Sequence, residues 1–213
     1  MEGSGAITGA SVIETSTHSR RWAGPLAWTA LALTIALMVT GLFLWNITGT
    51  SADGSAAENA LTGIAFLSFP AMGALLASRR PANAIGWLLL GIGLVASLLI
   101  ASMGYAAYGL VTNDEGAPGA TIAAWFVAWL WFPLILTIPT FLPLLFPTGS
   151  LPTKRWRPVA WFTGAILVIV TVPAMLEERL AEGDYNVPNP IGIASLGDTE
   201  EQLFTREEQV GRG

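Results

Sequence analysis

The chain has 213 residues, of which 53% are hydrophobic and 12% charged, and its formal net charge is −5. Soluble domains contain about 25% charged residues, so this low share and the long unbroken apolar runs exclude an ordinary soluble domain and indicate a protein that lies in a bilayer. The absence of cysteine excludes disulfides, thiolate catalysis and cysteine-ligated metals.

The first part of the chain combines a polar segment with an apolar one. Residues 1–24 are rich in Ser, Thr and Gly and have no apolar period, which predicts a disordered cytoplasmic N-terminus. Residues 25–47 are apolar and long enough to cross a hydrocarbon core of about 30 Å at about 1.5 Å per residue. A cleaved signal peptide is the alternative, but its apolar core would be only about 7–15 residues. We therefore predict an uncleaved span.

Four further apolar runs follow in the chain. They cover residues 57–78, 84–111, 120–146 and 159–176. The sequence thus predicts an all-α fold, a polytopic membrane helix bundle of about five transmembrane helices within residues 25–176. Residues 177–213 form an acidic tail without a sixth run, in which 199–210 could form a short surface helix or stay disordered.

The basic residues predict the orientation of the bundle. Seven of them fall in the N-terminal segment or in two of the predicted loops: Arg20, Arg21, Arg79, Arg80, Lys154, Arg155 and Arg157. The loops around Asp53 and Asp114, on the opposite side, contain no Lys or Arg. Because short cytoplasmic loops of membrane proteins are enriched in Lys and Arg, we expect a multi-pass plasma-membrane protein with a cytoplasmic N-terminus and an extracytoplasmic tail.

Small residues and prolines mark two of the spans. Glycines in a membrane helix let a neighbouring backbone approach closely, and the third span offers Gly86, Gly91, Gly93 and Gly104 for such packing. Prolines remove backbone hydrogen bonds, and the fourth span and its end carry Pro133, Pro139, Pro143 and Pro147. This helix is expected to kink, either as a hinge or as a static bend that helps the bundle to pack.

The sequence offers no set of residues for catalysis. The interiors of the spans contain no ionisable residue, which argues against proton-coupled transport, because such residues mark proton and ion pathways. His18 is the only histidine and has no partner ligands at metal-binding spacing. We therefore expect no enzyme activity, no metal and no cofactor. The basic loop around Lys154 suits anionic lipid headgroups and offers no groove for a nucleic acid.

Three segments carry a resemblance to a known family. They are RRPANAIGWLLLGIGL at 79–94, LFPTGSLPTKRWRPVAW at 145–161 and NPIGI at 189–193. In this order they resemble the N-terminal membrane region of sensor histidine kinases of two-component systems. The resemblance implies a further span, a phosphoacceptor histidine and an ATP-binding domain after residue 193, and the sequence printed here contains none of them.

What the resemblance implies for this chain is a sensory or anchoring role in signal transduction without kinase activity. Its partners would be the lipid bilayer and either a second copy of the chain or a full-length sensor kinase. A small transporter subunit or another non-enzymatic membrane protein is the alternative. A truncated gene product, a separately encoded sensor half and a fragment all remain open.

Overall fold

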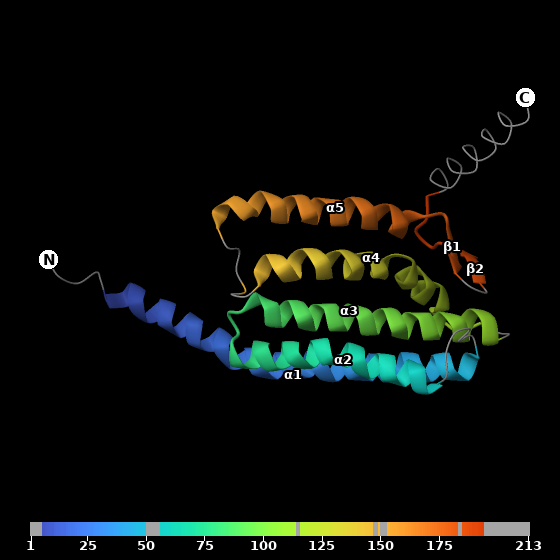
Figure 1. Cartoon of the computed structure of the whole chain (residues 1–213), viewed down its shortest axis with the longest axis horizontal. Helices are drawn as coiled ribbons and strands as arrows, with labels where there is room; N and C mark the ends of the chain where they lie inside the picture. Colours follow the sequence, from blue (N-terminus) through green and yellow to red (C-terminus); the bar gives the residue numbers. More distant parts are fainter. Residues whose placement is uncertain are drawn as a thin grey trace, which may run out of the picture.

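The computed structural model describes residues 6–49, 56–113, 116–146, 149, 153–182 and 185–193. These residues form five α-helices that run side by side, with consecutive helices pointing in opposite directions (Figure 1). The helices are α1 (Ala6–Thr48), α2 (Ala56–Arg79), α3 (Ala84–Ala107), α4 (Ala120–Leu145) and α5 (Arg157–Leu176). Strands β1 (Arg179–Glu182) and β2 (Tyr185–Pro188) follow. The predicted all-α helix bundle is confirmed.

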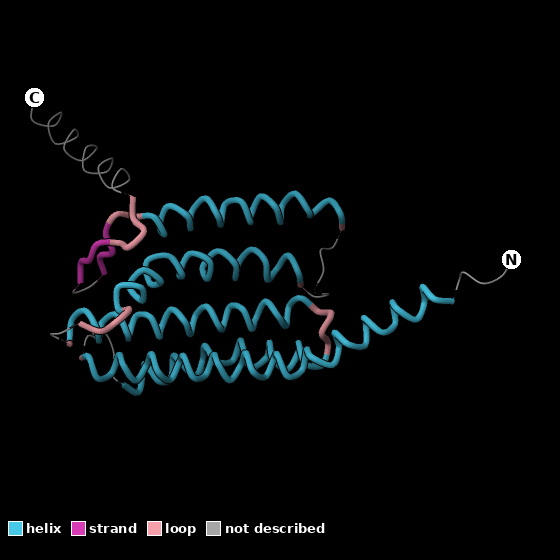
Figure 2. Tube along the Cα trace, turned by 180° about the vertical axis from the view of Figure 1, so that it is seen from behind, coloured by secondary structure: helices cyan, strands magenta, loops and turns pink. Residues whose placement is uncertain are grey.

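The bundle has two distinct ends, which Figure 2 shows from the opposite side. We call one the hairpin end, because β1 and β2 lie there together with the first turns of α2 and α4. We call the other the loop end, because it carries the turn at residues 80–83 and the short 3-10 helix Lys154–Trp156, η2. Every helix from α2 to α5 extends between these two ends.

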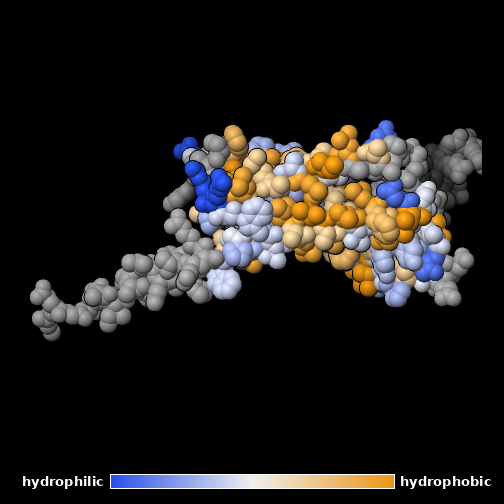
Figure 3. Space-filling model, turned by 90° about the horizontal axis from the view of Figure 1, so that it is seen from below, coloured by the Kyte–Doolittle hydropathy of each residue, from blue (hydrophilic) through white to orange (hydrophobic). Residues whose placement is uncertain are grey.

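Within the described residues, four helical segments are long and apolar enough to cross a membrane, as in a multi-pass membrane protein. They are Trp22–Thr48, Ala84–Thr112, Ala120–Leu145 and Arg157–Leu176. The second predicted span is present as α2, but its apolar part is the shorter segment Gly63–Arg79. Figure 3 shows an apolar band across the middle of one face, with hydrophilic residues gathered toward both ends.

Helix α3 lies at the centre of the bundle and has a well-defined start. The Asn83 side chain accepts a hydrogen bond from the Ile85 backbone N–H at 2.9 Å and so caps the first turn. At the other end the helix widens into a five-residue π-helical segment, η1 (Tyr108–Thr112). The Tyr105 hydroxyl donates to the carbonyl of Pro118 at 2.8 Å, which holds the following turn against α3.

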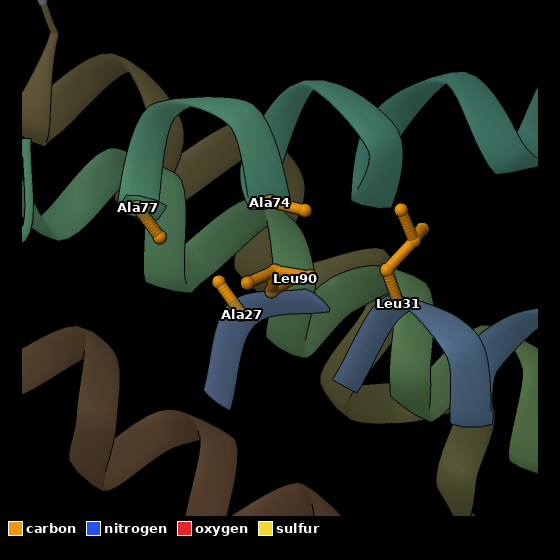
Figure 4. Close-up of a cluster of buried hydrophobic side chains, with 5 residues drawn as sticks. All are labelled: Ala27, Leu31, Ala74, Ala77 and Leu90. Carbon is orange, nitrogen blue, oxygen red and sulfur yellow. The ribbon is translucent and has the colours of Figure 1, made fainter. Parts of the chain in front are cut away.

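The core between α1, α2 and α3 is built mainly from small side chains. Ala27 and Leu31 of α1 face Ala74 and Ala77 of α2, and Leu90 of α3 closes this cluster (Figure 4). All five side chains are buried. Alanines at such a contact let helices approach closely, which is how membrane helices gain van der Waals contact without a hydrophobic drive from water.

The N-terminal segment corrects one prediction. Residues 1–24 are predicted to be disordered, yet α1 begins at Ala6 and continues without interruption to Thr48. Figure 1 shows its first turns extending away from the bundle at the loop end. The physical reason is that adding residues to an existing helix costs far less free energy than nucleating a new one. The helix formed by the apolar part of α1 therefore continues into the polar segment, although that segment has no apolar period.

The region after α5, predicted only as an acidic tail, contains a β-hairpin. Strands β1 and β2 pair antiparallel, with Glu182 opposite Tyr185 and Arg179 opposite Pro188. Gly183 and Asp184 are the two residues that connect them, and a Gly-Asp pair between two short strands is a hairpin signal in the sequence. The alternative of a surface helix at 199–210 falls outside the described residues.

Candidate functional site

The last helix ends in a compact structure that we call the cap, made of β1, β2 and residues 189–193. Leu180 of β1 is only 2% exposed and packs with Ala106 of α3 and with Ala123 and Ala124 of α4. Burying a leucine in this way stabilises the contact by about 1.5–3 kcal/mol. The hairpin is therefore attached to α3 and α4 as well as to α5, which precedes it in the chain.

Asn189 joins the cap to the end of α5. Its side chain is buried, and its Nδ2 donates to the carbonyl oxygens of Met175 at 3.0 Å and of Glu177 at 2.6 Å. Its Oδ1 accepts from the backbone N–H of Ile191 at 3.1 Å. The last carbonyls of a helix have no partner within the helix, so this amide supplies the hydrogen bonds that α5 lacks at its end.

Two further contacts hold the same helix end. A Cβ atom at Gly192 would lie 2.7 Å from the Glu177 carbonyl oxygen, so only glycine fits this close approach of two backbone segments. The Trp125 indole of α4 donates from Nε1 to the Met175 carbonyl at 2.9 Å. The end of α5 is therefore hydrogen-bonded both to the cap and to α4.

A cavity of about 300 Å³ lies beneath the cap, between α4, the end of α5 and the hairpin. Its lining residues are Ala124, Val127, Ala128, Trp131, Phe132, Ala174, Glu177, Arg179, Leu180 and Tyr185. This volume is at the lower end of what small-molecule pockets show. The lining combines an aromatic and aliphatic floor on α4 with a carboxylate and a guanidinium at the rim, which suits a small amphipathic molecule.

The charged rim of this cavity is partly fixed in position. Arg179 donates from Nε to the Asn186 side-chain oxygen at 2.7 Å and from Nη2 to the Asn186 carbonyl at 3.2 Å. These two bonds cross the hairpin and orient the guanidinium. On the floor, Trp131 stacks on Phe132 with ring centroids 3.8 Å apart.

Two buried polar atoms lie deeper along α4 and α5. Trp129 stands one helical turn after Trp125, and Thr171 stands one turn before Met175 on the antiparallel helix α5. The Trp129 Nε1 and the Thr171 Oγ1 are buried and have no hydrogen-bond partner among the described residues. An unpartnered buried polar atom lowers the stability by about 1–3 kcal/mol. The hydrogen-bonding groups of α4 and α5 are therefore less well satisfied at Trp129 and Thr171 than at Trp125.

At the loop end the structure brings two of the three quoted segments together. Gly149 has a positive φ of 76°, and a Cβ atom there would lie 2.1 Å from the Asn83 side-chain oxygen. Trp87 donates from its Nε1 to the Pro81 carbonyl at 3.0 Å, which closes the turn before α3. The close approach of Gly149 to Asn83 therefore joins the turn that starts α3 to the connection between α4 and α5.

The predicted basic residues gather at this same end. Arg79 and Arg80 are exposed at the end of α2, and Arg155 and Arg157 are exposed at the start of α5. Lys154 begins the short helix η2, and its side chain lies outside the description. The positive charge of the two loops is thus on one end of the bundle, while the exposed Glu58 and Glu177 are on the hairpin end.

The packing glycines of α3 fall into two groups. A Cβ atom at Gly86 would lie 2.7 Å from the Ala77 backbone nitrogen, and one at Gly104 would lie 2.6 Å from the Gly41 carbonyl oxygen. At Gly93 a Cβ atom would lie 2.5 Å from the ring of Pro70. Gly91 corrects the prediction, because it is exposed and nothing lies within 4 Å of its Cβ position. It points away from the other helices.

The prolines of the fourth span lie within a continuous helix. Pro133, Pro139 and Pro143 are inside α4, whereas Pro147 falls outside the described residues. Figures 1 and 2 show α4 changing direction along its length, as expected where prolines remove backbone hydrogen bonds. The Thr140 hydroxyl donates to the Leu136 carbonyl near the second of these prolines.

Sequence reasoning missed the residues that build the cap and its cavity. The segment 189–193 is among the quoted motifs, but its sequence does not reveal that Asn189 binds the end of α5.

Among the described residues no group of three His, Cys, Asp or Glu side chains could hold a metal ion. No family model matches the chain, and no curated protein or solved structure is significantly similar to it.

Proposed function

We propose that this protein is a membrane-embedded sensory or anchoring region related to two-component sensor histidine kinases, without a catalytic domain of its own. The observation that carries the proposal is the cap, because it connects a ligand-sized cavity of about 300 Å³ to the end of a helix that runs to the opposite end of the bundle. A molecule in that cavity would contact α4, α5 and the hairpin at once.

The proposed path of the signal is α5. Its end is bound by Asn189 and by Trp125, so a change in the cap acts directly on this helix. Its start lies next to η2, where Arg155 and Arg157 are exposed. A shift of the helix would therefore move charged groups at the loop end, which is how a rigid helix couples two distant sites.

The orientation of the protein is part of the proposal. We assign the loop end to the cytoplasm, because cytoplasmic loops are enriched in Lys and Arg and four exposed arginines lie there. The hairpin end, with Glu58 and Glu177 exposed, then faces outward. The cavity would thus meet molecules outside the cell or in the outer leaflet, and the output partner would be a second copy or a full-length kinase at the loop end.

The proposal is tested by asking whether the loop end responds to a change in the cap. The chain has no cysteine, so Thr153→Cys places a single reactive thiol at an exposed position directly before η2. The rate of thiol labelling is measured in proteoliposomes with and without Asn189→Ala. Asn46→Ala, an exposed change at the hairpin end of α1, is the matched control.

A sensory role predicts that Asn189→Ala changes the labelling rate at residue 153 and that Asn46→Ala leaves it unchanged. Equal rates in all three proteins would contradict the sensory part and leave a passive anchor. Solute flux through proteoliposomes made with the same protein would instead support a transporter subunit.

A further inference from the structure

A second concavity lies between α4 and α5, near the loop end. It has a volume of about 320 Å³ and is lined by Thr140, Pro143, Leu144, Trp156, Val159 and Thr163. We call this concavity the crevice. Its walls come from the last turns of α4, from Trp156 at the end of η2 and from the first turns of α5, so it is separate from the cavity beneath the cap.

The walls of the crevice are mainly aliphatic. Pro143, Leu144 and Val159 have no polar side-chain atom, and the Thr140 hydroxyl is directed to the Leu136 carbonyl of its own helix. Thr163 lies six residues after Arg157, about 9 Å along the axis of α5 at 1.5 Å per residue. An apolar chain is therefore the best match for the interior.

The mouth of the crevice has a different character. Trp156 lines it while being 45% exposed, and an indole ring prefers the membrane–water interface. The residues on either side, Arg155 and Arg157, are both exposed. Positive charge therefore stands at the level where the apolar interior meets water.

We infer that the crevice binds one anionic phospholipid, with part of an acyl chain between α4 and α5 and the phosphate near Arg155 and Arg157. Charge complementarity selects this occupant over a zwitterionic lipid, because the exposed Arg155 and Arg157 are the chain neighbours of Trp156, which lines the mouth. A Lys or Arg near an anionic headgroup favours that headgroup by about fivefold each. The bound lipid would hold the start of α5 against α4. This inference does not depend on the proposed sensory role.

The inference is tested by native mass spectrometry of the full chain purified in detergent. Phosphatidylglycerol and phosphatidylcholine with identical acyl chains are added separately, and the retained lipid is counted. The charge variant is Arg155→Gln with Arg157→Gln, and its matched control is Arg79→Gln with Arg80→Gln, two exposed arginines at the same end. The filling variant is Val159→Trp, and its control is Val168→Trp on the exposed surface of α5.

The charge variant is expected to lower phosphatidylglycerol affinity by about 25-fold, from about fivefold per arginine, and to leave phosphatidylcholine unchanged. Val159→Trp is expected to abolish the retained lipid, and both controls are expected to keep it. Soluble glycerol phosphate should not compete, because it lacks the acyl chain.

Equal losses in the charge variant and its control, or retention of lipid in Val159→Trp, would overturn the inference and indicate annular lipid only. Competition by glycerol phosphate would overturn it in favour of a phosphate site. If Val159→Trp does not fold, the charge variants decide the result alone, because they change only exposed side chains.

Discussion

Helices α3 and α5 are both apolar, yet they are held in opposite ways. In the most apolar part of the segment Ala84–Thr112, 44% of the residues are buried within the protein, compared with 6% for Arg157–Leu176. The backbone of α3 lies against α1 and α2 at Gly104 and Gly86. Among the other α-helices, α5 packs mainly on α4, and its last turn is tied down by Asn189 and Trp125.

This difference separates a fixed part of the molecule from a part that can move. Backbone contacts through glycine allow only one register of the helices, because any sliding would bring a Cβ atom against a neighbouring backbone. A helix held by side chains on one face and by hydrogen bonds at one end can pivot about that end. Under the proposed sensory function, the cap is therefore the point at which a signal would reach α5.

The largest effect is expected inside the fixed part. Gly86→Ala places a Cβ atom 2.7 Å from the Ala77 backbone nitrogen and should lower stability by about 1–3 kcal/mol through overpacking. Gly91→Ala makes the same chemical change where no atom lies within 4 Å, and should raise stability by up to about 1 kcal/mol through helix propensity. Thermal unfolding in detergent compares the two Tm values. Equal Tm values for the two variants would contradict the conclusion that α3 is closely packed at Gly86 and open at Gly91.

The contact between the two loops should give the next largest effect. Gly149→Ala adds a Cβ atom at a φ of +76° and 2.1 Å from the Asn83 side chain, which should cost about 1–3 kcal/mol. Gly49→Ala is the control, because its φ is +65° and its Cβ position is open. A lower Tm for Gly149→Ala than for Gly49→Ala isolates the contact with Asn83. Identical Tm values for the two variants would mean that the backbone strain at positive φ lowers the stability and that the contact with Asn83 does not.

An effect of about the same total size, but confined to the end of α5, is expected in the cap. Asn189→Ala removes the two hydrogen bonds that the side chain donates to carbonyls at the end of α5. Each bond contributes about 0.5–1.5 kcal/mol of stability. Hydrogen exchange should become faster around residue 176 and stay unchanged in α3. The control is Asn186→Ala, which removes only the exposed hydrogen bond that the Asn186 side-chain oxygen accepts from Arg179. Faster exchange throughout the bundle would contradict the view that the Asn189 hydrogen bonds act only on the end of α5.

The smallest effect should come from the tie between α4 and α5. Trp125→Phe removes the hydrogen bond to the Met175 carbonyl and should cost about 0.5–1.5 kcal/mol. Trp131→Phe is the control, because its Nε1 donates to the Ala128 carbonyl of its own helix. Limited proteolysis after α5 reports the difference. Equal cleavage rates for the two variants would mean that the cap alone holds the end of α5 and that the Trp125 hydrogen bond does not contribute.

The helices follow from the sequence, whereas their partners do not. The apolar runs at 84–111 and 120–146 predict α3 and α4 closely, because few polar residues can stay inside a membrane helix. Which glycine of α3 faces a neighbour depends on the rotation of the helix, so Gly91 and Gly93 look alike in the sequence and differ in the structure. Asn189 acts on carbonyls 12 and 14 residues earlier, a contact that no local pattern encodes.

The most direct test measures the motion of α5 against the fixed part. In the cysteine-free chain, spin labels at Leu26 and Leu61 report on α1 and α2, and labels at Leu26 and Val168 report on α5, all at exposed positions. We predict a narrow distance distribution for the first pair and a broader one for the second, which Asn189→Ala broadens further. Distributions of equal width, both unaffected by Asn189→Ala, would contradict this prediction.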